Sequence, residues 1–173
     1  MEPAIYTASV PVFLHYLARV DTLLDKIDAA PDGAAFLSAR LAPDMFPVGV
    51  QLRTAAGFSL RIAMALAGRD VPDFSDVTPD LDGLRGFVGR SRAALDALSP
   101  EAFVDATDRR YAHRAGFADL DQDAWAFLCQ YGLPNMMFHL SMAYAGLRQA
   151  GLDLGKADFD GLHVYPQGFS FER

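Results

Sequence analysis

The chain has 173 residues, of which 51% are hydrophobic and 21% charged, so we expect one folded domain over residues 1–173. The net charge of −7 argues against nucleic-acid and anionic-lipid partners, because both need a basic surface. The single cysteine, Cys129, excludes an intrachain disulfide and is expected to be a small core residue. We find neither an uncharged apolar stretch of about 18 residues nor a secretory signal, which predicts no membrane partner and a cytoplasmic location.

Four long helices are predicted, because apolar residues recur at alternating spacings of four and three. Ser9 should cap the first helix, and Pro134 should kink the last by removing a hydrogen bond near Gln130. Such a pattern predicts an all-α fold of the four-helix-bundle type. The predicted helices cover residues 9–29, 47–67, 81–98 and 121–150.

The segments between and after these helices carry further expectations. A short helical turn is expected at 34–39, and an irregular stretch or a brief hairpin at 108–118, before the last helix. Arg109 and Arg110 are expected to pair with their sequence neighbours Asp105 and Asp108. The tail should pack on the bundle or on a second chain, because it holds too much apolar surface to leave in water. Its large apolar residues are Phe159, Leu162, Tyr165, Phe169 and Phe171.

Three polar side chains fall at helix positions that should turn inward. Gln51 interrupts the apolar stripe of the second helix, and Asn135 lies one turn before His139 on the last. A histidine with a polar group four residues away can chelate a metal or form a buried hydrogen-bonded pair. The residues alone favour the pair, because one imidazole makes a poor zinc site. The other three histidines are expected at or near the surface: His15, His113 and His163.

Several catalytic signatures are absent from the sequence. It has no glycine-rich phosphate loop and no Gly-x-Ser-x-Gly nucleophile elbow. Its acidic residues gather in loops and at helix starts, where solvation and the helix dipole favour them, so paired-carboxylate catalysis is not expected. The residue types and their spacing do not decide whether the chain is an enzyme.

Five short motifs occur in a fixed order along the chain. They are residues 6–13, residues 42–47, Leu133-Pro134-Asn135 with Phe138-His139, Tyr144 with Leu147-Arg148 and Gly151, and Leu154-Gly155-Lys156 with Asp158-Phe159. Together they resemble an uncharacterised bacterial family, domain of unknown function 1993, from the first helix to about Gly161. That family resembles a branch of the DinB/YfiT-like superfamily, which includes metal-dependent enzymes. The resemblance implies an antiparallel four-helix bundle, often found as a homodimer.

The metal-binding members of that superfamily hold a divalent ion with three histidines. Placed on this chain, their pattern falls on Gln51, Asn135 and His139. Amide oxygens are weak, neutral ligands beside imidazole, so the resemblance implies a degenerate site for Zn or Ni, with His139 as its remaining histidine. No resident cofactor is therefore expected.

Three functions stay open. In the first, Gln51, Asn135, His139 and Met142 line a polar pocket that binds a small molecule, because buried polar groups need partners. In the second, the chain is a divalent-metal-dependent enzyme of the thiol-dependent transferase or hydrolase class. In the third, it is a non-catalytic interaction protein whose aromatic tail, 159–171, buries a homodimer interface.

Overall fold

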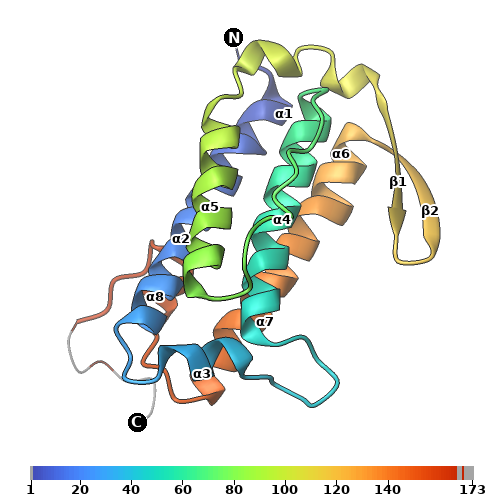
Figure 1. Ribbon diagram of the computed structural model, residues 1–173. Coiled ribbons are helices and arrows are strands. Elements are labelled where there is room, and N and C mark those ends of the chain that lie inside the picture. Colours follow the sequence, from blue (N-terminus) through green and yellow to red (C-terminus); the bar gives the residue numbers. More distant parts are fainter. Residues whose placement is uncertain (1, 167–168, 170–173) are drawn as a thin grey trace.

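The computed structural model describes residues 2–166 and 169, and most of them are helical (Figure 1). Helix α4 packs against α7, α5 and α2, and α2 also packs against α5. The four long helices are α2 (Val10–Asp28), α4 (Val48–Leu66), α5 (Leu81–Asp96) and α7 (Leu133–Gln149). The first three begin within two residues of the starts predicted from apolar spacing, and the last begins later than predicted.

The core follows α4, which is buried on most of its surface. Ala55, Ala56 and Ala63 are completely buried there, and their small side chains let the neighbouring helices approach closely. Phe13 and Leu17 of α2 are also completely buried. The core therefore holds α4 at a fixed position between α2, α5 and α7.

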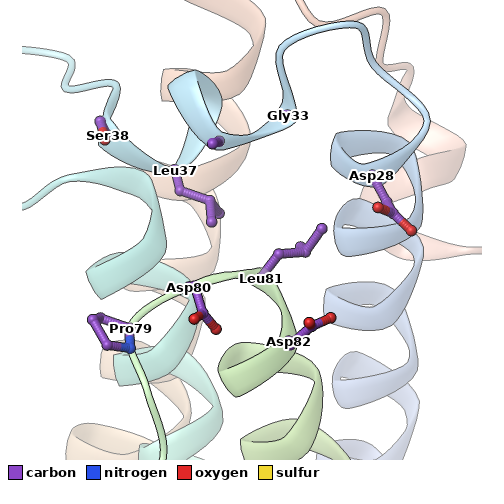
Figure 2. Close-up of a pocket in the computed structure, with 9 residues that line it drawn as sticks. Asp28, Gly33, Leu37, Ser38, Pro79, Asp80, Leu81 and Asp82 are labelled. Atoms are coloured by element: carbon purple, nitrogen blue, oxygen red, sulfur yellow. The ribbon is translucent and has the colours of Figure 1, made fainter.

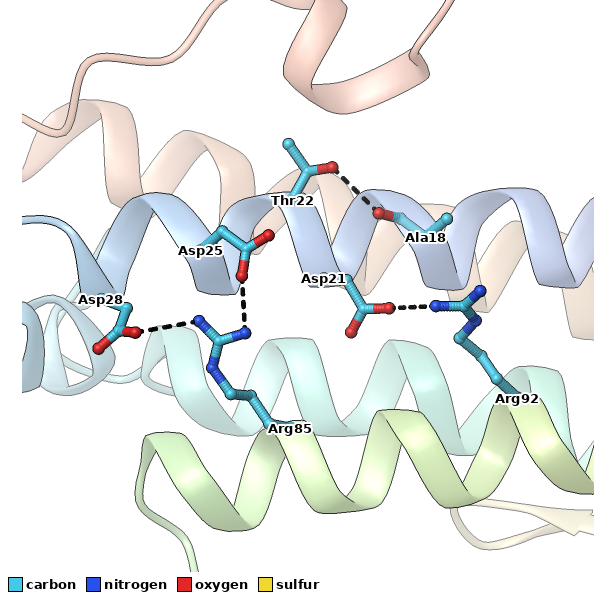
Figure 3. Close-up of polar contacts among 7 residues, drawn as sticks. All are labelled: Ala18, Asp21, Thr22, Asp25, Asp28, Arg85 and Arg92. Carbon is cyan, nitrogen blue, oxygen red and sulfur yellow. Dashed lines mark hydrogen bonds and ion pairs between the residues drawn. The ribbon is translucent and has the colours of Figure 1, made fainter.

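The exposed edge between α2 and α5 is polar (Figure 3). Arg85 of α5 reaches Asp25 at 2.6 Å and Asp28 at 3.3 Å, and Arg92 reaches Asp21 at 2.7 Å. Exposed pairs of this kind contribute at most about 1 kcal/mol each. These ion pairs add to an interface that apolar contacts already stabilise.

Short helical elements connect and flank the long helices. The prediction that Ser9 caps α2 is wrong, because its hydroxyl donates to the carbonyls of Ile5 and Tyr6 at 2.6 and 3.2 Å. A preceding helical turn supplies these acceptors directly before α2. The short elements are α1 (Ala4–Thr7), α3 (Gly33–Ser38), η1 (Pro100–Phe103), η2 (Ala106–Asp108), α6 (Ala124–Ala126) and α8 (Lys156–Asp160).

A two-stranded antiparallel hairpin precedes the last helix, so the fold is not purely α. It consists of β1 (Arg110–Ala115) and β2 (Ala118–Asp123), which pair Arg110 with Asp123 and Arg114 with Asp119. Gly116 turns the chain between the strands with φ of 60°. The predicted start of the last helix, at residue 121, is wrong because β2 continues to Asp123.

The last helix is also interrupted before Pro134. The segment η3 (Phe127–Gly132) is a π-helix, and Pro134 lies in the first turn of α7, where its missing N–H costs nothing. The segment before Pro134 is thus wound more widely than an α-helix. Cys129 in this segment is exposed, so the prediction of a core cysteine is wrong. The buried side of α7 consists of Met136, Leu140, Ala143, Gly146 and Leu147.

The tail packs partly on its own chain. Helix α8 contacts α2, and the Phe159 ring lies 6.3 Å from Tyr16 and 5.7 Å from Tyr144, between ring centroids. Leu162 remains 72% exposed, and Phe171 lies outside the described residues. Among the described residues, every helix is too short or too polar to cross a bilayer.

Candidate functional site

Gln51 of α4 and His139 of α7 meet where these two helices pack. The Gln51 side chain is 3% exposed, and its Oε1 lies 2.6 Å from Nδ1 of His139. The Gln51 amide nitrogen donates to the carbonyl of Phe46 at 3.5 Å. Gln51 therefore links the loop before α4 to the imidazole on α7.

This hydrogen bond fixes the protonation pattern of the imidazole. Because Oε1 of Gln51 accepts, Nδ1 of His139 carries the proton, and Nε2 of the neutral ring keeps its lone pair. Burial lowers the pKa of His139 and so favours the neutral ring. Among the described residues, Nε2 has no hydrogen-bond partner. The site thus presents one hydrogen-bond acceptor from a half-buried ring.

Two aromatic rings hold the imidazole in place. Phe58 of α4 stacks on it with centroids 5.7 Å apart and an interplanar angle of 18°, and Phe138 meets its edge at 5.2 Å. A cavity of about 220 Å³ opens beside this ring. It is lined by Asp44, Met45, Phe46, Gln51, Phe138 and His139.

Asn135 and Met142, which were expected to line the pocket, are not among the residues that line this cavity. The amide nitrogen of Asn135 donates to the Tyr131 carbonyl of the preceding turn at 2.7 Å, so part of the amide is already engaged. Both residues are half-buried. The structure thus joins Gln51 and His139 directly, while Asn135 is anchored to its own helix one turn away.

The donor set does not fit a three-histidine metal site. Gln51 uses its amide oxygen to accept from His139, and the nearest member of the inherited pattern, Asn135, offers only a neutral amide oxygen. Among residues 2–166 and 169, no group of three or more His, Cys, Asp or Glu side chains is arranged to hold a metal ion. Gln51 instead occupies the role of a partner that orients the imidazole.

The other histidines make structural contacts. His15 donates through Nε2 to the Asp160 carbonyl at 2.7 Å, and the exposed His163 bonds the Asp160 carboxylate. The imidazole of His113 is half-buried, contrary to the surface position expected from the sequence, and its Nε2 lies 2.8 Å from Oε1 of Gln122. These three rings lie outside the cavity beside His139.

The expected pairing of Arg109 and Arg110 with Asp105 and Asp108 is wrong in the described part of the chain. Arg110 pairs across the hairpin with Asp121 at 3.2 Å, and Arg109 donates to the carbonyl of Leu66. The sequence indicated neither of these partners.

A larger cavity, of about 630 Å³, lies between the end of α2, α3 and the start of α5 (Figure 2). Its carboxylates are Asp28, Asp80 and Asp82. Asp28 pairs with Arg85, and Asp80 caps α5 by accepting from the Gly83 amide at 2.8 Å. These contacts account for two of the three acidic groups, so the cavity is a weaker candidate than the one beside His139.

Sequence reasoning missed Phe58, which stacks on the imidazole, and Arg61, which follows it on α4. Arg61 donates to the Tyr131 hydroxyl at 3.3 Å and lies over the Phe58 ring at 4.8 Å. Gln51 and Phe58 are seven residues apart, so they lie on the same side of α4. This spacing is the sequence signal by which Phe58 could have been found.

The mostly helical fold is DinB-like, as comparison with a solved structure shows. The chain is similar to the crystal structure of a DinB family member protein from Shewanella denitrificans, with a TM-score of 0.82 and 26% identity over 92% of this chain and 93% of that one. The sequence model named domain of unknown function (DUF1993) matches residues 5–160, so the chain belongs to that family, as its motifs indicated. No curated protein matches it.

Proposed function

We propose that the cavity beside His139 binds a small ligand that donates a hydrogen bond to Nε2 of that histidine. The observation that carries the proposal is the 2.6 Å hydrogen bond from Nδ1 to Gln51, because it leaves Nε2 as an acceptor. Burial of the ring supports the same state, since it lowers the pKa of His139 and keeps the imidazole neutral. Hydroxyl, thiol and amine groups are suitable donors.

The walls of the cavity limit the rest of the ligand. Met45, Phe46 and Phe138 provide apolar surface, and the volume is about 220 Å³. Drug-sized ligands occupy pockets of about 300 Å³ or more, so this ligand is smaller. A donor group on an apolar body of about one ring fits these constraints.

In this proposal the four long helices form an antiparallel bundle of the DinB/YfiT-like type, and the inherited metal site is degenerate. Gln51 orients His139 instead of binding a metal. A neutral imidazole is also a competent general base, so the same geometry is suited to removing a proton from a bound thiol or alcohol. Binding is the part of the function that the hydrogen bond supports most directly.

NMR of protein labelled with ¹⁵N in its histidines tests the proposal, because the ¹⁵N shift reports the state of each ring nitrogen. Benzyl alcohol, benzyl mercaptan and benzylamine are compared with toluene, which has the same ring and no donor. We expect at least one of the three to shift Nε2 of His139 more than toluene does. Equal effects of all four compounds would show that no donor binds there.

Two variants and a metal titration complete the experiment. His139→Phe keeps an aromatic ring beside Phe58 and should abolish the donor-specific binding, whereas His163→Phe, at an exposed histidine, should preserve it. Zn²⁺ and Ni²⁺ are titrated separately. A stoichiometric shift of Nε2 by either ion would favour the metal-dependent enzyme and overturn the metal-free pocket.

We also propose a homodimer, because large apolar side chains remain exposed on the loop before α4, on α4 and on α7. Phe46 is 56% exposed, Val50 40% and Phe138 53%. A second copy would remove this surface from water. Light scattering should give twice 18.8 kDa for the wild type and a smaller mass for Phe138→Ser, while Val104→Ser, at a 62% exposed valine, leaves the mass unchanged. A monomeric wild type would exclude the dimer.

A further inference from the structure

A second cavity, separate from the one beside His139, lies where the hairpin meets the end of α4. Its volume is about 340 Å³, within the range of small-molecule sites. The residues that line it come from α4, the loop after α4, the start of β1 and η3. They include Arg61, Val71, Arg109, Arg110, His113 and Phe127.

Three guanidinium groups line this cavity, and two of them have no carboxylate partner in the described part of the chain. Arg61 donates to the neutral hydroxyl of Tyr131 at 3.3 Å, and Arg109 donates to the backbone carbonyl of Leu66. Only Arg110 pairs with a carboxylate, that of Asp121 at 3.2 Å. The residues that line the cavity include three arginines and no Asp or Glu, so the lining is basic in a chain whose net charge is −7.

Buried polar atoms near the cavity also lack partners. Nε of Arg109 and Nδ1 of His113 are both buried, and neither has a hydrogen-bond partner among the described residues. Oε1 of Gln122 accepts from Nε2 of His113 at 2.8 Å, so Nδ1 of that ring is left as an acceptor, which an anion does not satisfy. The unpaired Nε–H of Arg109 is a donor, and because an unpaired buried donor is costly, it is the atom on this lining that supports an anionic ligand.

The aromatic side of the cavity is rigid and apolar. Tyr111 and Phe127 are 8% and 3% exposed, and their rings stack with centroids 4.9 Å apart at an angle of 4°. The Tyr111 hydroxyl donates to the Ala106 carbonyl at 2.8 Å, which fixes the ring from its far end. Val71 adds apolar surface. A ligand here would meet guanidinium groups on one part of its surface and aromatic carbon on another.

We propose that this cavity binds a small organic oxyanion, a carboxylate or phosphate group carried on an apolar or aromatic body. Guanidinium groups recognise both oxyanions through parallel N–H···O bonds, and they do so best beside low-dielectric walls. Arg61 and Arg109 bind the anionic group, while Tyr111 and Phe127 contact the body. This inference does not depend on the pocket beside His139.

Isothermal titration calorimetry and NMR of the arginine Nε–Hε groups test this site in the full chain. Benzoate, phenyl phosphate and inorganic phosphate are the anionic probes, and benzamide is the neutral one. We expect benzoate or phenyl phosphate to bind at least about tenfold more tightly than benzamide and to shift the Arg109 Nε–Hε signal. If benzoate binds more tightly, the site prefers a carboxylate, and if phenyl phosphate does, it prefers a phosphate. Inorganic phosphate measures binding without the aromatic body.

Matched variants separate a specific site from general electrostatics. Arg61→Gln should weaken binding about tenfold or more, because a charge-assisted hydrogen bond is lost. Arg114→Gln removes the same charge from β1 at a side chain that is 64% exposed and does not line the cavity, so binding should change less than about twofold. Equal losses in both variants would overturn the proposal, as would the absence of binding by all three anions.

A third variant guards against a folding defect in Arg61→Gln. Ala112 is exposed and lines the cavity, so Ala112→Glu introduces a carboxylate that competes for the arginines without removing any of them. Circular dichroism should match the wild type, while anion binding falls about tenfold or more. Undiminished binding by a folded Ala112→Glu protein would place the anion elsewhere and contradict the inference.

Discussion

The amide oxygen of Gln51 accepts a hydrogen bond of 2.6 Å from Nδ1 of His139, which joins α4 to α7 through their side chains. Both helices are otherwise held together by apolar contacts, so this bond is a polar interaction within a largely apolar interface. A polar pair in such a place resists substitution, because removal of either partner leaves the other unpaired. It also leaves Nε2 as the hydrogen-bond acceptor of the neutral imidazole.

Replacing Gln51 with Glu should raise the pKa of His139, because a carboxylate beside Nδ1 stabilises the imidazolium. The NMR shifts of the His139 ring, followed against pH, measure the change. Gln149→Glu adds the same charge at the exposed end of α7 and should leave the titration nearly unchanged. Similar shifts in the two variants would mean that Gln51 and His139 are not in contact.

The stability of the chain should fall as the pH is lowered through the titration of His139. Burial lowers the pKa of this histidine in the folded state, whereas the unfolded chain keeps a value near 6.5. The unfolded state therefore binds more protons than the folded state in this pH range. The stability contributed by the neutral, buried His139 is fully present above about pH 6.5, and it is lost as the pH falls through the lower pKa of the folded state.

Urea unfolding at about pH 7.5 and about pH 5.5 checks this dependence against His139→Phe, which cannot titrate at that position. The free energy of unfolding should fall more in the wild type than in the variant over this interval. An identical decrease in both proteins would assign the pH dependence to other groups.

The long helices could be predicted because their apolar residues follow the helical period. Gln51 was also recognisable, as a polar residue within such a stripe, and it is buried as that position requires. The extent of β2 was not, because Asp119, Asp121 and Asp123 alternate without an apolar face. Their pairing opposite residues of β1, such as Arg110 and Arg114, is a cross-strand contact, and the propensities of the single residues do not report it.

The candidate site could be predicted only in part, because some of its contacts join residues that are distant in sequence. The sequence indicated that Gln51, Asn135 and His139 approach one another, and the structure joins Gln51 directly to His139. Asn135 instead donates to the Tyr131 carbonyl one turn earlier. The cavity at Arg61 depends on contacts between α4, β1 and η3, which are distant in sequence, so no motif announces it.

Replacing Phe159 with Ala should destabilise the chain by about 1 to 3 kcal/mol, less than a fully buried phenylalanine, because the ring is half-buried. Its contacts with Tyr16 and Tyr144 are lost in the variant. Val164→Ala, at a 90% exposed valine, should change stability by less than about 0.5 kcal/mol.

Thermal unfolding and light scattering, measured together, separate packing within the chain from a role in assembly. The Phe159→Ala protein should unfold at a lower temperature and keep the mass of the wild type. A reduced mass with unchanged stability would instead assign this tail residue to an interface between copies.

Gly132 and Gly86 should respond in opposite directions when each is replaced with Ala. A Cβ at Gly132 would lie 2.7 Å from Cγ1 of Ile62 and 3.1 Å from its Cδ1, because η3 passes closely over α4 there. The overpacking should cost about 1 to 3 kcal/mol, since the buried Ile62 has little room to move.

At Gly86, in α5, no atom lies within 4 Å of the added Cβ, so the higher helix propensity of Ala should stabilise the chain by about 1 kcal/mol. Urea unfolding of both variants measures the two effects, and a Gly132→Ala protein as stable as Gly86→Ala would show that η3 does not pack closely on α4.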